Sequence, residues 1–274
     1  MKRLLTALVG VPLAMWANFG LPEPWFFALM LLVMIGCAVE FLRIVRPLAP
    51  GAPLWLLHVF LPLVAIGTWA IASGRVADSP LYLLLLTALL GIVLPTALFA
   101  ARTPLSETLP ALAIVGFGTV YLALPAVAFG RIQGTDPWLT FLLVAIIWLG
   151  DTGAFYIGSR WGRHKLAPTI SPKKSWEGAV AGFATSLIAT AVWSYCQLDR
   201  IDLGVLALGA VVAIAGQVGD LVESMFKREA KVKDSGTLLP GHGGLLDRMD
   251  SALFAAPALL IGAWLIGFEV IARK

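Results

Sequence analysis

The chain has 274 residues, of which 59% are hydrophobic and only 13% are charged, and its mean hydropathy is +0.88. A soluble globular protein carries about a quarter charged residues, so this composition excludes an ordinary water-soluble domain. A net charge of +4 and a pI of 9.2 also occur in nucleic-acid-binding proteins. We expect no nucleic-acid partner here, because in a chain of apolar segments the distribution of the basic residues among the connections matters more than their total.

Apolar segments of about twenty residues recur along the whole chain, and each is long enough to cross the ~30 Å hydrocarbon core of a bilayer. Backbone groups in lipid must be hydrogen-bonded within their own segment, so we expect helices. The sequence predicts an all-α polytopic integral membrane protein with about nine transmembrane helices, at residues 4–20, 25–42, 54–72, 80–99, 109–129, 138–157, 176–196, 203–222 and 251–270.

The distribution of Lys and Arg predicts the orientation of these helices. If the spans alternate and the N-terminus is cytoplasmic, fifteen of the twenty basic residues lie on the cytoplasmic side. The other five lie on the opposite side: Arg75, Arg131, Arg200, Arg273 and Lys274. We therefore expect a cytoplasmic N-terminus and a C-terminus on the opposite side of the membrane.

Two connections are long and polar, 158–175 and 223–250, and both are predicted to be cytoplasmic. Long polar loops in a membrane protein with otherwise short connections are typical carriers of function. We expect residues 131–274 to form the catalytic region. Residues 1–130, with about five spans, are expected to be a scaffold that could also make oligomer contacts.

Two features of the spans receive structural interpretations. Glu40, near the end of the second span, is interpreted as a partner of Arg43 or as a side chain that reaches the membrane interface. Gly178 and Gly182 form a G-x-x-x-G pattern that would allow close helix packing, although this pattern is weak evidence for dimerisation.

The strongest candidate site runs from the end of the eighth span into the ninth. Asp220 and Glu223 are three residues apart and share one helix face, and Asp247 and Asp250 repeat this spacing where the next helix begins. Carboxylate pairs at facing helix ends suit Mg²⁺, which also takes phosphate oxygens as ligands. A basic loop with helix-capping acids would explain any one of these residues. It does not explain the whole window, because a carboxylate at the position of Asp220 near the membrane boundary is costly unless it is paired or metal-bound.

Phosphate-binding residue types lie between these acids. The basic side chains are Lys227, Arg228, Lys231, Lys233 and Arg248, and such groups are suited to phosphates. Gly241, Gly243 and Gly244 give the backbone freedom to approach an anion near a helix N-terminus.

A second window surrounds the sixth and seventh spans. Asp151 lies inside the sixth span, where an acid is a functional candidate, with a structural ion pair to a neighbouring helix as the alternative. Ser171, Lys173, Lys174 and Ser175 offer hydroxyl and ammonium groups where the seventh span begins. They could form a phosphate cradle, but from this stretch alone a helix N-cap followed by topology-determining lysines is preferred.

The polar residues from Ser224 to Asp250 resemble a known signature. The order S-x-x-K-R-x-x-x-x-K-D over 224–234, followed by P-x-H-G-G-x-x-D-R-x-D over 240–250, is similar to that of the phosphatidate cytidylyltransferases, or CDP-diacylglycerol synthases. The Asp151 segment and residues 171–178 also resemble this family, with Ser175 where the family usually has Thr. The resemblance covers about a third of the chain, all of it in the C-terminal half.

The resemblance implies transfer of the cytidylyl group of CTP to phosphatidic acid, which yields CDP-diacylglycerol and pyrophosphate for phospholipid biosynthesis. It implies a requirement for Mg²⁺, with room for a second cation, and Asp220, Asp247 and Asp250 as metal ligands. Lys227 and Arg228 are expected to join these acids in catalysis. The expected substrate-binding residues are Asp151, Ser171, Lys173, Lys174, Ser224, Lys233, Asp234, His242, Gly243, Gly244 and Arg248.

The same resemblance implies an enzyme of the inner membrane whose active site faces the cytoplasm, where CTP is present, and a homodimer is compatible with it. Two alternatives remain open. Another CTP-using membrane enzyme, such as a polyprenol or dolichol kinase, would transfer the γ-phosphoryl group instead. A transporter would carry acids and bases near the bilayer midplane in several spans, whereas here they gather at one face. The CDP-alcohol phosphotransferases are disfavoured, because the chain has no D-G-x-x-A-R-type motif.

Overall fold

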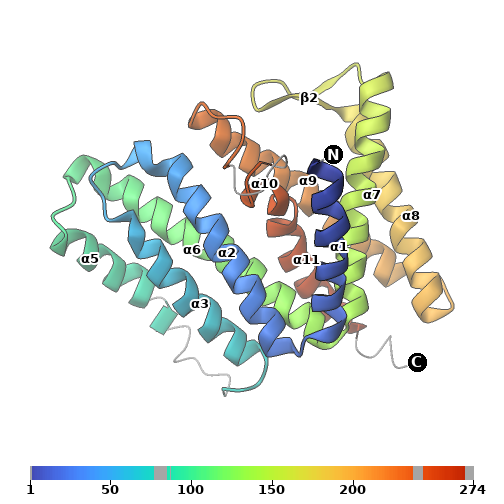
Figure 1. Cartoon of the computed structure of the whole chain (residues 1–274), viewed down its shortest axis with the longest axis horizontal. Helices are drawn as coiled ribbons and strands as arrows, with labels where there is room; N and C mark the ends of the chain where they lie inside the picture. The colour runs from blue at the N-terminus through green and yellow to red at the C-terminus, as the bar shows by residue number, and fades with distance from the viewer. Residues whose placement is uncertain (1, 77–84, 87, 237–242, 269–274) are drawn as a thin grey trace.

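The computed structural model describes residues 2–76, 85–86, 88–236 and 243–268, with side chains described from residue 10 onward. It is a bundle of helices with one small two-stranded sheet (Figure 1). The elements in chain order are α1 (Lys2–Gly20), α2 (Glu23–Val45), η1 (Arg46–Leu48), η2 (Leu54–Leu56), α3 (Leu57–Ala72), η3 (Leu89–Val93), α5 (Leu94–Ala100), α6 (Leu105–Thr135), α7 (Pro137–Trp161), β1 (Lys165–Ala167), β2 (Ser171–Ser175), α8 (Trp176–Leu198), α9 (Leu203–Glu229), α10 (Leu246–Met249) and α11 (Ala252–Leu265).

The predicted all-α polytopic membrane fold is confirmed. Within the described residues, seven helical segments are long and apolar enough to cross a bilayer, rather than the nine expected from the sequence. The first predicted span forms α1, which is not one of these seven, and part of the fourth lies outside the described residues. Leu89–Ala100, which includes most of the described residues of the fourth span, is a shorter apolar helix. Its first turn is π-helical, just before Pro95, which has no N–H to donate to the carbonyl of Gly91.

The two long polar connections contain more regular structure than the hydropathy predicted. α9 continues to Glu229, seven residues beyond the predicted end of that span, so the first part of the 223–250 connection is helical. The 158–175 connection contains the antiparallel hairpin β1–β2, in which Lys165 pairs with Ser175 and Ala167 with Ser171. Hydropathy could not show either feature, because both segments contain several charged and polar residues that lower their mean hydropathy.

An aromatic cluster packs between the helices near the C-terminal end of α9. Phe226 of α9 packs against Phe41 of α2 and Tyr121 of α6, with ring centroids 5.8 and 6.0 Å apart, and Tyr121 also contacts Phe254 of α11 at 6.0 Å. These rings join four helices directly below the end of α9. The hairpin, α10 and the beginning of α1 lie at this same end of the molecule (Figure 1).

Small residues bring α7 and α8 into close contact along their length. A Cβ at Gly182 would lie 2.8 Å from the carbonyl oxygen of Gly150, and a Cβ at Gly178 would lie 2.9 Å from that of Ala154. A Cβ at Gly153 would overlap the side chain of Thr185. The G-x-x-x-G pattern of α8 therefore serves packing within the chain.

We predict that Gly182→Ala destabilises the protein by about 1–3 kcal/mol, because the added methyl group meets backbone of α7 that cannot move aside. The midpoint of thermal unfolding in detergent should fall. Gly116→Ala on α6 is the matched control, since no atom lies within 4 Å of a Cβ there and alanine is the better helix former. Equal midpoints for the two variants would contradict the packing role of Gly182.

Candidate functional site

The centre of the site is Lys227, two residues before the end of α9. Its Nζ forms ion pairs with Glu223, one helical turn earlier, and with Asp247 Oδ1 of α10 at 2.7 Å. The Glu223 side chain is fully buried, and the side chains of Lys227 and Asp247 are 12% and 7% exposed. One ammonium group therefore compensates two buried carboxylates, and Glu223 Oε1 has no hydrogen-bond partner among the described residues.

The second oxygen of Asp247 organises the backbone around it. Oδ2 accepts hydrogen bonds from the N–H groups of Ser235 (2.9 Å) and Gly244 (2.8 Å), and the Asp247 N–H donates to Ser235 Oγ (3.3 Å). Gly243 has φ +82°, a conformation that favours glycine, and a Cβ there would lie 2.9 Å from Oδ2. The anion that these two glycines approach in the structure is thus the carboxylate of Asp247, and their binding of a substrate phosphate stays a prediction.

Asp220 connects α9 to the hairpin. Its Oδ2 pairs with Lys174 Nζ of β2 at 2.5 Å, and its Oδ1 accepts a weak hydrogen bond from Ser224 Oγ at 3.3 Å. Both members of the ion pair remain partly accessible, with 28% and 27% of their side-chain surfaces exposed. Lys174 follows the exposed Lys173 and precedes Ser175, which caps α8 by accepting from the N–H of Gly178. The two interpretations of this stretch, helix cap and charged cradle, are therefore compatible.

Asp250 and Asp151 complete the group of acids. Asp250 Oδ1 accepts from the Ser251 N–H at 2.6 Å, and the Asp250 carboxylate interacts electrostatically with Asp220 and Asp151. Asp151 also interacts with the exposed Arg248. Asp151 of α7, Asp220 of α9 and Asp250 at the α10–α11 junction are thus near enough to interact electrostatically.

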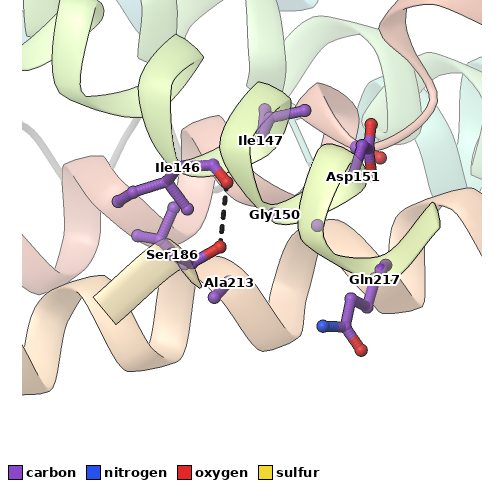
Figure 2. A pocket seen from close by; sticks show the side chains of 11 residues that line it. Ile146, Ile147, Gly150, Asp151, Ser186, Ala213 and Gln217 are labelled. Carbon is purple, nitrogen blue, oxygen red and sulfur yellow. Dashed lines mark hydrogen bonds between the residues drawn. The ribbon is translucent and has the colours of Figure 1, made fainter. Parts of the chain in front are cut away.

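A small cavity lies beside Asp151 (Figure 2). It has a volume of about 30 Å³ and is lined by side chains of α7, α8, α9 and Ser251, including Asp151, Gln217 and Ser186. Ser186 Oγ donates to the carbonyl oxygen of Ile146 across it, at 2.9 Å. This volume is enough for a water molecule but far below the roughly 300 Å³ of a small-molecule pocket. This cavity is therefore too small to hold a nucleotide.

The donor set fits a divalent cation that is shared with a phosphate. Five acids face three bases at the site: Asp151, Asp220, Glu223, Asp247 and Asp250 against Lys174, Lys227 and Arg248. Within the described parts of the chain, no three His, Cys, Asp or Glu side chains form a ready metal cage. Mg²⁺ is typically held by one or two carboxylates together with phosphate oxygens and water. A site with more acids than bases, in which no three described acids converge on one point, suits this mode of Mg²⁺ binding.

The remaining predicted residues differ in what the structure shows of them. Arg228 donates from Nε to the carbonyl oxygen of Ile170 at 3.0 Å and from Nη1 to that of Val232, so it ties the hairpin turn to the end of α9. Lys233 and Asp234 are exposed and Ser171 is half-buried. His242 lies outside the described residues.

The sequence analysis missed three residues that contribute polar groups here. Glu40 is 2% exposed and accepts hydrogen bonds from Ser235 Oγ and the Leu246 N–H, so its interpretation as a partner of Arg43 or an interfacial side chain is wrong. Ser235 lies in the motif window but was not singled out. Gln217 lines the cavity and donates to the carbonyl oxygen of Ala179. An acid within an apolar span was the available signal for Glu40.

Comparison with known proteins gives a consistent result. The sequence model of a family described as the cytidylyltransferase family matches residues 1–265. The phosphatidate cytidylyltransferase of Haemophilus influenzae is 35% identical over 282 aligned positions, which cover 93% of this chain and 96% of that protein. The phosphatidate cytidylyltransferase of Staphylococcus haemolyticus is 48% identical over 126 positions, 45% of this chain and 48% of its own. That of Staphylococcus saprophyticus is 44% identical over 156 positions, 56% of each.

We predict that Lys227→Met destabilises the protein by about 3–5 kcal/mol, because it leaves two buried carboxylates without their cation. The yield of monodisperse protein and its unfolding midpoint in detergent measure this loss. Lys174→Met is the matched control, since the partly exposed pair with Asp220 should contribute about 1 kcal/mol or less. A Lys227→Met protein as stable as the control would show that the buried acids do not depend on this ammonium group.

Proposed function

The chain belongs to the cytidylyltransferase family, and from this premise we propose that it transfers the cytidylyl group of CTP to phosphatidic acid. A phosphate oxygen of the lipid attacks the α-phosphorus of CTP in line. The bond from that phosphorus to the bridging oxygen of the β-phosphate breaks, and pyrophosphate leaves. The product, CDP-diacylglycerol, contains the new phosphoanhydride bond and stays in the membrane.

The observation that carries this proposal is the cluster of acids and bases at one end of an apolar bundle. The step requires positioning and charge neutralisation rather than a protein nucleophile. A phosphate monoester is already an anion near neutral pH, so no strong general base is needed, and the described acids and bases need only hold and screen phosphates. The end of α9 is joined to the hairpin by the Lys174–Asp220 ion pair and to α10 by the Lys227–Asp247 ion pair, so these elements form one connected frame for this task.

We assign the following roles to the side chains. Lys173, Lys233 and Arg248 are exposed around the acids and would contact the triphosphate or the lipid phosphate. Lys174 is held by Asp220 at the hairpin edge and would orient a phosphate there. Lys227 keeps Asp247 in place, because its Nζ lies in the buried ion-pair network.

Asp220, Asp250 and Asp247 would hold the Mg²⁺ that the family generally uses. Bound there, Mg²⁺ would neutralise charge on the phosphates and polarise the α-phosphate. Asp220 and Asp250 are the better placed ligands. Asp247 already accepts from Lys227 and from two backbone N–H groups, although Oδ1 retains a lone pair.

We also propose that this end of the bundle faces the cytoplasm and that the protein resides in the inner membrane. The predicted excess of Lys and Arg on this side, and the location of CTP in the cytosol, support the orientation. Phosphatidic acid would then enter sideways from the inner leaflet, with its phosphate at the level of the acids.

We predict that the purified protein transfers the α-phosphate of CTP to lipid. With phosphatidic acid in mixed micelles and Mg²⁺, label from [α-³²P]CTP should enter the organic phase, whereas label from [γ-³²P]CTP should appear in pyrophosphate. Lipid labelled only from the γ position would instead show a kinase that uses CTP. Substrate flux across proteoliposomes without CTP turnover would show a transporter.

We predict that Asp250→Asn lowers kcat about 10²–10³-fold while leaving the unfolding midpoint unchanged. Hydrogen bonds between described residues engage only Oδ1 of Asp250, and an asparagine oxygen can accept the same bond from Ser251. Asp247→Asn is a poorer test, because its amide would face either Lys227 or the N–H of Ser235 with a donor. Near-normal turnover of Asp250→Asn would remove Asp250 from the catalytic set.

A further inference from the structure

Glu40 is a buried carboxylate in a helix far from the site in sequence. It lies near the end of α2, is 2% exposed, and its hydrogen-bond partners are 195 and 206 residues away along the chain. None of the ion pairs between described residues includes it. Burying a carboxylate costs several kcal/mol unless hydrogen bonds compensate it, so its partners are the key to its role.

Both partners of Glu40 lie next to Asp247. Glu40 Oε2 accepts from Ser235 Oγ at 3.0 Å and from the Leu246 N–H at 2.8 Å. Ser235 in turn donates its N–H to Asp247 Oδ2 and accepts from the Asp247 N–H, and Leu246 directly precedes Asp247. We call Ser235, Gly243, Gly244, Leu246 and Asp247 the Asp247 turn. Glu40 thus holds this turn at two points, each one bond or one residue from Asp247.

The backbone around Glu40 is shaped to admit its carboxylate. A Cβ at Gly236 would overlap Glu40 Oε1, and a Cβ at Gly244 would overlap both Glu40 Oε2 and Ser235 Oγ. One turn earlier on α2, Gly36 leaves room for Leu245, whose Cδ2 would lie 2.8 Å from a Cβ there. α10 accordingly packs beside the end of α2 (Figure 1). Glycines on both sides of the contact allow this close approach.

We propose that Glu40 is a positioning residue for the cytidylyl transfer, which fixes the Asp247 turn and thereby the direction of the Asp247 carboxylate. The inference rests on the proposed function, in which Asp247 is one of the three carboxylates that would hold the cation. The proposal assigns a specific role to an N-terminal helix, because Glu40 of α2 accepts the hydrogen bonds of Ser235 and Leu246 in the connection that follows α9. A displacement of about 1 Å in a reacting geometry can lower a rate about 10²-fold, so a small loosening of this turn would affect turnover.

The test is Glu40→Ala, with kinetics and amide exchange measured on the full-length protein in detergent. We expect kcat to fall about 10–100-fold, while the KM values for CTP and phosphatidic acid change by no more than about threefold. The amides of Ser235, Gly244 and Leu246 should exchange with deuterium about tenfold faster or more, because their acceptors are lost or loosened. The exchange measurement does not depend on catalysis, so it tests the contact even if the wild type transfers a different group.

Two further variants separate positioning from general stability. Glu107→Ala removes another carboxylate of the N-terminal half, which accepts from the Gly51 N–H at 2.7 Å away from the site, and it should leave kcat unchanged. Glu40→Gln keeps an acceptor for Ser235 and Leu246, and should retain kcat within about threefold of the wild type.

Ser235→Ala extends the test to a protein that keeps Glu40. It should lower kcat less than Glu40→Ala, and the double variant should resemble Glu40→Ala alone, because both changes act on the same contact. The proposal would be overturned if the losses of kcat in Glu40→Ala and Ser235→Ala multiplied in the double variant. It would also be overturned if Glu40→Gln lost as much kcat as Glu40→Ala, or if the amides of Ser235 and Leu246 exchanged at an unchanged rate in Glu40→Ala. If Glu40→Ala does not fold, the other two variants decide it: an unchanged kcat in Ser235→Ala, or a loss of more than about threefold in Glu40→Gln, would overturn the proposal.

Discussion

The burial of the Lys227 ion pairs is the constraint on which the rest of the site depends. A charged group inside an apolar bundle is costly, and here two acids and one base are buried together between α9 and α10. These buried charges are stable only if the end of α9 and α10 keep a fixed distance from each other, so that the ion pairs stay formed. The aromatic cluster around Phe226 fixes the end of α9, and the hydrogen bonds from the N–H groups of Ser235 and Gly244 to Asp247 fix α10.

Glycine has two different structural roles in this molecule. Between α7 and α8, Gly150, Gly153 and Gly182 let two helices approach until backbone and side chain touch. In the Asp247 turn, Gly243 supplies a left-handed conformation and Gly244 makes room for side chains of its own chain. The first role aligns Asp151 of α7 with the hairpin that precedes α8, and the second directs Asp247.

Much of the fold and of the site could be predicted from local sequence, because a membrane helix and a dense polar motif are both local signals. Asp220, Lys227, Asp247 and Asp250 lie within about thirty residues, and the structure does gather them. Glu40 could not be assigned in this way, because its partners are about 200 residues away and pairing with Arg43 was the simpler local explanation. The hairpin and the last turns of α9 were missed because polarity marks the end of a membrane segment and not the end of a helix.

The charge balance of the site constrains the order in which its ligands can bind under the proposed function. The five acids at the centre of the site interact with only three bases, Lys174, Lys227 and Arg248, so a polyphosphate alone would meet repulsion near Asp220 and Asp250. A cation alone would find only scattered carboxylates, since no described trio converges on one point. Each ligand therefore improves the site for the other, and reciprocity requires the coupling to be equal in both directions. Under the proposed function, an acidic centre with the exposed Lys173, Lys233 and Arg248 near it favours a nucleotide that arrives together with its cation.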